Sequence, residues 1–150
     1  MRSEYPDPGR VWQRVLQTEP QEQQTLQMLL RQLSMDLAFL KRHPVAKDDP
    51  LILEYAEQLH SLKGILLLTG GSIPRDTAGV SEHSLQRCFD HGLRRLSAYQ
   101  LRTSDPVYGP VFRELAVQTG QHCFRITQLL GRSLQGGKEK GVVSLRTPFV

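Results

Sequence analysis

The sequence has no long apolar run. The longest, Ile65–Leu68, is far shorter than the roughly 20 residues that a membrane-spanning helix needs. The first residues, from Met1 to Pro6, also lack the apolar segment that is typical of a signal peptide. We therefore expect a cytoplasmic protein that neither crosses a membrane nor has a membrane partner.

Cysteine is scarce as well. The chain has two, Cys88 and Cys123, and each lies among apolar residues of helix-forming type. Such thiols are typically reduced, buried and inert, so we expect no disulfide. A Cys-x-x-Cys pair, a glycine-rich phosphate loop, the alternating pattern of strands and a serine in a nucleophile turn are missing too. These absences argue against a nucleotide-binding loop, a β-rich fold and a serine hydrolase.

Charge is present in quantity, and its balance is basic. The 150 residues include 19 of Lys and Arg against 15 of Asp and Glu, which gives a formal net charge of +4. A basic face would attract nucleic-acid phosphates, but here no aromatic-interleaved motif and no recognition helix accompanies the basic residues. We interpret them as a solvated surface and keep a DNA-associated bundle as a third alternative. They include Arg10, Arg14, Lys41, Arg42, Arg94, Arg95, Arg113 and Arg125.

Four stretches have the apolar periodicity of amphipathic helices. Prolines and glycines at 44, 50, 70–71, 106 and 131 mark their ends. The pattern predicts an all-α, antiparallel four-helix bundle made of two helical hairpins, joined by a longer crossover from Ser72 to Ser81. We expect an N-terminal arm over 1–21, in which Trp12 anchors the chain, a bundle over 22–131 and a flexible tail over 132–150. The predicted helices are 22–42, 51–69, 82–103 and 108–130.

Each predicted helix has an inward stripe. In the second helix this stripe includes Glu57 and His60, which lie three residues apart and therefore on the same face. A carboxylate and an imidazole among core residues suggest a metal centre inside the bundle. The predicted stripes are Leu26, Leu30, Leu33, Leu37 and Leu40; Leu53, Glu57, His60, Gly64 and Leu67; Leu85, Cys88, Phe89, Gly92, Leu96 and Tyr99; and Phe112, Leu115, Ala116, Thr119, His122, Cys123, Ile126 and Leu130.

These motifs resemble the ferritin-like superfamily, and within it the rubrerythrin-related proteins of clostridial bacteria. The resemblance covers residues 24–131. It rests on Glu57-Gln58-Leu59-His60 and the following Ser61–Gly70, and on a second set of motifs in the second hairpin. In that family the first and third helices each give a glutamate, the second and fourth each give a Glu-x-x-His, and the set holds two iron or manganese ions. The second set is Tyr99, Ser104-Asp105-Pro106, Phe112-Arg113-Glu114-Leu115-Ala116 and His122.

Carried over residue by residue, the resemblance implies a degenerate di-iron site. Glu57 and His60 match the second helix, and His122 matches the imidazole of the fourth, but the other glutamate positions are altered. They fall on Leu33 or Gln32, on Gly92 and on Thr119. One carboxylate cannot balance two divalent ions in a low-dielectric core, so we expect no working di-iron centre and no activity of the family's kind.

Two hypotheses remain for the surviving residues. The preferred one is a non-catalytic binding or structural protein without a cofactor, acting as a dimer, in which Glu57 pairs with one or both histidines. The alternative is a metal-binding protein or oxidoreductase with a single iron, manganese or zinc ion at Glu57, His60 and His122. Asp36 could approach this cluster as a substitute carboxylate, but we expect it in solvent at the edge of the bundle. The remaining candidates are expected at the surface or at helix ends: His91, Glu54, Glu114, His43 and His83.

Overall fold

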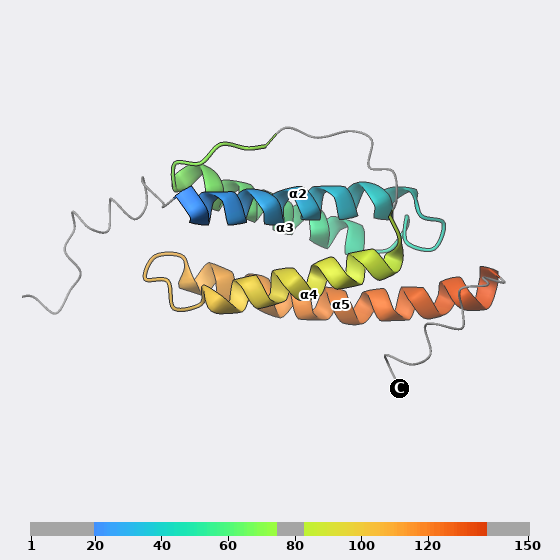
Figure 1. The fold of residues 1–150 in the computed structure, drawn as a ribbon. Helices are drawn as coiled ribbons and strands as arrows, with labels where there is room; N and C mark the ends of the chain where they lie inside the picture. The colour runs from blue at the N-terminus through green and yellow to red at the C-terminus, as the bar shows by residue number, and fades with distance from the viewer. Residues whose placement is uncertain (1–19, 75–82, 138–150) are drawn as a thin grey trace, which may run out of the picture.

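The structure, a computed structural model, is an all-helical bundle in the part of the chain that it describes, residues 20–74 and 83–137 (Figure 1). The arm up to residue 19, the second half of the predicted crossover and the tail from residue 138 lie outside these ranges. No helix in the described ranges is long and apolar enough to cross a membrane. The helices are α2 (Pro20–Arg42), α3 (Leu51–Leu68), α4 (Leu85–Leu101) and α5 (Gly109–Gly137).

The bundle consists of two hairpins, as predicted. α2 packs along α3, and α4 packs along α5 over most of their lengths. In Figure 1 the blue and green hairpin lies on the yellow and orange one. α2 also contacts α4, and α3 contacts α5, so all four helices enclose one core.

Two of the predicted helix ends follow from local hydrogen bonds. α3 begins where the Asp49 carboxylate accepts the backbone N–H of Leu51 at 3.0 Å. It ends at Gly70, whose φ of 89° is the left-handed conformation that glycine adopts readily after a helix. α4 begins later than predicted, because Ser84 is its N-cap and accepts the backbone N–H of Arg87 at 3.0 Å.

The predicted end of the fourth helix at Gly131 is wrong. α5 continues through this glycine to Gly137. A terminating glycine takes a positive φ, and within the described ranges Gly70 is the glycine that does so. Gly131 instead keeps a helical conformation, and a Cβ added there would meet nothing within 4 Å, so this position does not require glycine.

The inward stripes predicted for the first and fourth helices are confirmed, and most of the third is too. In α4, Phe89 and Leu96 are only partly buried and pack against the core from its edge. Buried side chains on the predicted stripes include Leu26, Leu30, Leu33, Leu37, Leu40, Leu85, Cys88, Gly92, Tyr99, Phe112, Leu115, Ala116, Thr119, His122, Cys123, Ile126 and Leu130.

The stripe predicted for the second helix is wrong. Leu53, Glu57, His60 and Leu67 are exposed, and α3 instead buries a stripe two residues out of register. Two residues correspond to about 200° around a helix, so the helix faces the core with its opposite side. Both stripes have the same spacing, but the buried one contains more apolar volume and leaves the Glu57 and His60 pair in water. The buried residues are Leu51, Tyr55, Gln58, Leu62, Ile65 and Leu66.

Candidate functional site

The structure does not bring together the three residues proposed as a metal set. Glu57 and His60 lie on the outer face of α3, whereas His122 is 3% exposed and points into the core. Within residues 20–74 and 83–137, the group of three potential ligands whose donor atoms lie within 4.8 Å of one another is Asp36, His83 and Cys88. The predicted burial of Glu57 and its pairing with His60 in the core are therefore wrong.

His122 has a different carboxylate partner from the predicted one. Its Nε2 lies 3.0 Å from Glu54 Oε1, and its ring lies 5.1 Å from the Tyr55 ring between centroids. Burial, with a smaller contribution from the positive charge of Arg95, lowers the pKa of His122 to about 4. Glu54 favours the protonated form, but its carboxylate is half exposed and water screens its charge. His122 is thus a neutral imidazole at neutral pH.

Asp36 on α2 is fully buried, which corrects the expectation that it lies in solvent. Its Oδ1 accepts the Nε2–H of His83 at 2.7 Å and the Nδ1–H of His91 at 2.8 Å. Its Oδ2 accepts a hydrogen bond from Arg95 Nη1 at 2.9 Å. The structure therefore places His83 and His91 around a buried carboxylate, where the sequence suggested a helix end and a surface position.

These partners keep Asp36 ionised. Burial by itself raises the pKa of this carboxyl group, but the hydrogen bonds from both histidines and the charge of Arg95 outweigh it. The pKa of Asp36 therefore lies below its ordinary value. His83 Nδ1 accepts the backbone N–H of Ser84 at 2.8 Å, so Nε2 is the nitrogen that donates to Asp36.

Arg95 is the buried cation of the bundle, although the sequence suggested a surface residue. Its side chain is 1% exposed, and its Nη2 donates to the Tyr55 hydroxyl at 3.3 Å. Its guanidinium carbon also lies 5.5 Å from the centre of the Tyr55 ring, a cation–π distance. One turn earlier, Gly92 lets α5 approach α4, because a Cβ there would come within 2.7 Å of Cys123 Sγ.

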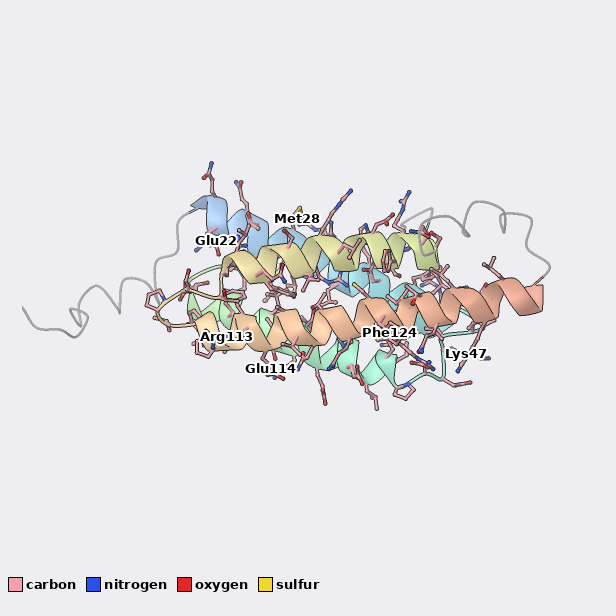
Figure 2. The ribbon with its side chains drawn as sticks, turned by 90° about the horizontal axis from the view of Figure 1, so that it is seen from below. Glu22, Met28, Lys47, Arg113, Glu114 and Phe124 are labelled. Carbon is pink, nitrogen blue, oxygen red and sulfur yellow. The ribbon has the colours of Figure 1, made fainter. Side chains whose placement is uncertain are left out.

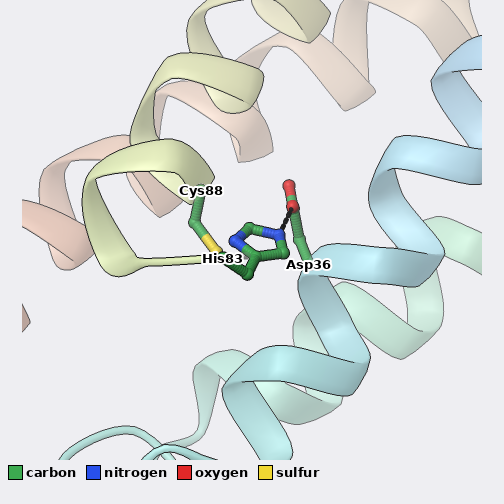
Figure 3. Close-up of side chains that lie close together, drawn as sticks. All are labelled: Asp36, His83 and Cys88. Atoms are coloured by element: carbon green, nitrogen blue, oxygen red, sulfur yellow. Dashed lines mark hydrogen bonds and ion pairs between the residues drawn. The ribbon is translucent and has the colours of Figure 1, made fainter. Parts of the chain in front are cut away.

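Cys88 completes the cluster around Asp36. Its side chain is fully buried in the first turns of α4, facing His83 and Asp36 (Figure 3). Burial, and to a lesser extent the nearby Asp36 carboxylate, raises the pKa of the Cys88 thiol. The charge of Arg95 lowers this pKa but does not outweigh burial, so the free thiol is protonated at neutral pH.

A second buried polar group lies further along the core and contains only neutral side chains. Gln58 Oε1 accepts the Tyr99 hydroxyl at 3.1 Å and the Thr119 hydroxyl at 3.4 Å. Two donors, Gln58 Nε2 and Arg95 Nε, have no hydrogen-bond partner among the described residues. The bundle centre thus presents amide, hydroxyl and guanidinium groups.

These residues do not fit the dinuclear centre that the ferritin-like resemblance implies. Among the buried side chains of the described ranges, Asp36 is the single carboxylate, and it is already bound to Arg95. Two divalent ions need several anionic oxygen ligands, and this core offers one carboxylate whose charge is already paired with a guanidinium.

Comparisons of the chain with protein-family models, curated proteins and solved structures found no match. The ferritin-like resemblance therefore rests on the sequence motifs.

Proposed function

We propose that this chain is a non-catalytic, ferritin-like helical bundle that acts as a binding or structural protein and has lost the di-iron centre of its relatives. One observation is the main support: the buried carboxylate of Asp36 is paired with the buried guanidinium of Arg95 at 2.9 Å. A fixed organic cation here serves as the counter-charge that metal ions provide in a dinuclear centre. Neutral groups from Gln58, Tyr99 and Thr119 complete the core polar network.

Iron oxidation tests this proposal directly. Purified full-length chain is mixed with Fe(II) in air, and the formation of Fe(III) is followed by absorbance. We expect the same rate as in protein-free buffer, because the core lacks the anionic ligands that hold and oxidise a pair of ions. Saturable oxidation that Asp36→Asn or His122→Ala abolishes, and that the exposed-site control His60→Ala retains, would contradict the proposal.

A second copy of the chain is the partner we propose. Leu53 is 70% exposed and Leu67 58% exposed on the outer face of α3. Each lies seven residues from His60, so they are about 10 Å to either side of it on one stripe. An antiparallel two-fold contact centred on His60 places Leu53 of one copy against Leu67 of the other. We also infer a cytoplasmic location, with which the two free, buried thiols Cys88 and Cys123 are consistent.

A further inference from the structure

We propose that Asp36, His83, Cys88 and His91 form a site for one zinc ion at the end of the bundle where α4 begins. This inference goes beyond the proposed function and is independent of it, because a structural ion at this place provides no iron oxidation.

The donor atoms already face one another. Asp36 Oδ1, His83 Nε2 and Cys88 Sγ belong to the group whose ligand atoms all lie within 4.8 Å of one another. Figure 3 shows the side chain from α2 pointing toward the two that come from the start of α4. His91 Nδ1, 2.8 Å from the same Asp36 oxygen, is the fourth donor. An ion that takes the place of the two hydrogen bonds to Oδ1 would meet Asp36, His83 and Cys88 directly, and the His91 side chain would shift toward it to become the fourth ligand.

The chemistry of this donor set selects the metal. Two imidazoles, one thiolate and one carboxylate suit zinc, which takes four nitrogen, sulfur and oxygen ligands in a tetrahedral arrangement. Magnesium, calcium and manganese prefer oxygen ligands, and a thiolate disfavours them. The site is therefore distinct in both ligands and metal from the dinuclear iron or manganese centre of the ferritin-like family.

The charge of the surroundings makes Cys88 indispensable. Asp36 shares its negative charge with Arg95, which holds Oδ2 at 2.9 Å and leaves Oδ1 for the ion. An ion of charge +2 beside this guanidinium needs a second anionic donor, and the Cys88 thiolate is the one that the cluster offers. Zinc binding replaces the thiol proton with a Zn–S bond and releases that proton to solvent.

The surroundings of His83 also suit a metal ligand. Its Nδ1 lies 2.8 Å from the Ser84 backbone N and 3.2 Å from the Ser84 carbonyl oxygen. When Nε2 gives its proton up to bind zinc, the proton moves to Nδ1, which can donate it to this carbonyl. An imidazole held by a backbone carbonyl through its second nitrogen is the usual arrangement of a zinc-binding histidine.

A titration with cobalt(II) tests the inference, because this ion occupies tetrahedral zinc sites. A thiolate bound to it is detected by a charge-transfer absorption band. Metal-free full-length chain is titrated with Co²⁺ under reducing conditions, and Zn²⁺ is then added in competition. We expect about one ion per chain, a thiolate-to-cobalt band, visible bands of tetrahedral intensity and complete displacement by zinc.

Matched variants identify the ligands. Cys88→Ser should remove the charge-transfer band and weaken zinc binding at least about tenfold, as should His83→Gln. His83 precedes α4, so its replacement leaves the helices intact; circular dichroism checks the fold of every variant. Cys123→Ser removes the other buried thiol, and Glu57→Gln with His60→Gln removes the exposed pair, and both should bind as the unchanged chain does. A chain that binds neither metal, or binding that survives Cys88→Ser, would overturn the inference.

Discussion

Among single residues, Asp36 is a fully buried carboxylate with three side-chain hydrogen-bond partners. A carboxylate without solvent contact is stable only when hydrogen bonds and opposite charge replace its hydration. Here three side chains do so, from His83, His91 and Arg95. The opposite charge comes from the buried guanidinium of Arg95, so each member of this ion pair depends on the other.

Separating this ion pair should destabilise the fold strongly. We expect Asp36→Ala to lower the free energy of unfolding by about 3–5 kcal/mol, because it leaves a buried guanidinium without a counter-charge. The double variant Asp36→Leu with Arg95→Met should regain much of that loss, since both charges then disappear together. Urea unfolding measures both values. If the loss of free energy of unfolding in the double variant equals the sum of the losses in the two single variants, Asp36 and Arg95 are not coupled.

The buried His122 should make the stability of the fold depend on pH between its ordinary pKa and the lowered one. Because burial lowers the folded-state pKa from 6.5 to about 4, the unfolded chain binds a proton within this interval and the folded chain does not. The contribution of His122 to the free energy of unfolding therefore has its full value above pH 6.5. It is lost as the pH falls toward 4. It amounts to about 3 kcal/mol at most, at about 1.4 kcal/mol per pKa unit.

The free energy of unfolding, measured at several pH values, checks this pH dependence. His122→Gln should flatten the slope of stability between pH 6.5 and 4, whereas the exposed His60→Gln should keep it. Glu54 and Tyr55 from α3 and Arg95 from α4 face His122, and none of them changes in either variant. An unchanged slope in His122→Gln would assign the dependence to another group.

Among the helices, the close approach of α4 and α5 depends on one glycine. Gly92 faces Cys123, and an added Cβ would come within 2.7 Å of the sulfur. By contrast, a Cβ added at Gly120 in the middle of α5 would meet nothing within 4 Å. The two positions therefore separate the packing effect of a methyl group from its effect on helix propensity.

The two matched substitutions should change the stability of the protein in opposite directions. We expect Gly92→Ala to destabilise the protein by about 1–3 kcal/mol, because the extra methyl group forces α4 and α5 apart. Gly120→Ala should stabilise it by about 0.5–1 kcal/mol through helix propensity. Melting temperatures measured side by side test both. A stabilised Gly92→Ala chain would mean that the contact with Cys123 relaxes without cost.

For the whole molecule, two arginine–carboxylate pairs nearer the surface join the two hairpins in addition to the contacts of Asp36 and His122. Arg102, just after α4, binds both carboxylate oxygens of Glu22 on α2 at 2.7 Å. Arg125 on α5 binds the carboxylate of Asp49, at the start of α3. Beyond these contacts, apolar side chains remain on the surface, including Met28 and Phe124 (Figure 2) and the Leu53 and Leu67 stripe of α3. This stripe is the surface that a second copy would cover.

The proposed dimer can be tested by changing one leucine. We expect the native chain to sediment as a dimer and Leu53→Glu to sediment as a monomer, because the substitution places a carboxylate against Leu67 of the other copy. Leu101→Glu is the control, since Leu101 is 77% exposed but belongs to the last turn of α4 and not to α3. A native chain that is monomeric at every concentration, or a Leu53→Glu chain that still dimerises, would contradict the contact.

The sequence predicted the helices well and the site poorly, for one physical reason. Apolar spacing alone determines where a helix forms, so even the polar members of the stripes had the right spacing. Asp36 lies three residues after Leu33, and Arg95 lies three after Gly92 and four before Tyr99. This spacing is compatible with an inward position for both, but the prediction left them off the stripes because charged residues generally lie in solvent. That rule fails where two buried charges meet each other.

Sequence alone determined the four helices, their hairpin order, the ends at Pro50 and Gly70, and the inward faces of α2 and α5. Local propensity, capping and apolar periodicity act within one helix, so no partner is needed to infer them. Only the tertiary structure decided which side of α3 faces the core and which polar groups meet there. Two stripes of equal spacing compete on that helix, and the choice depends on what the other three helices bury against it. The packing of the helices left Glu57 and His60 in water. It also brought Asp36 of α2 beside His83 and Cys88, which are far from Asp36 in sequence and meet it only when α4 packs on α2.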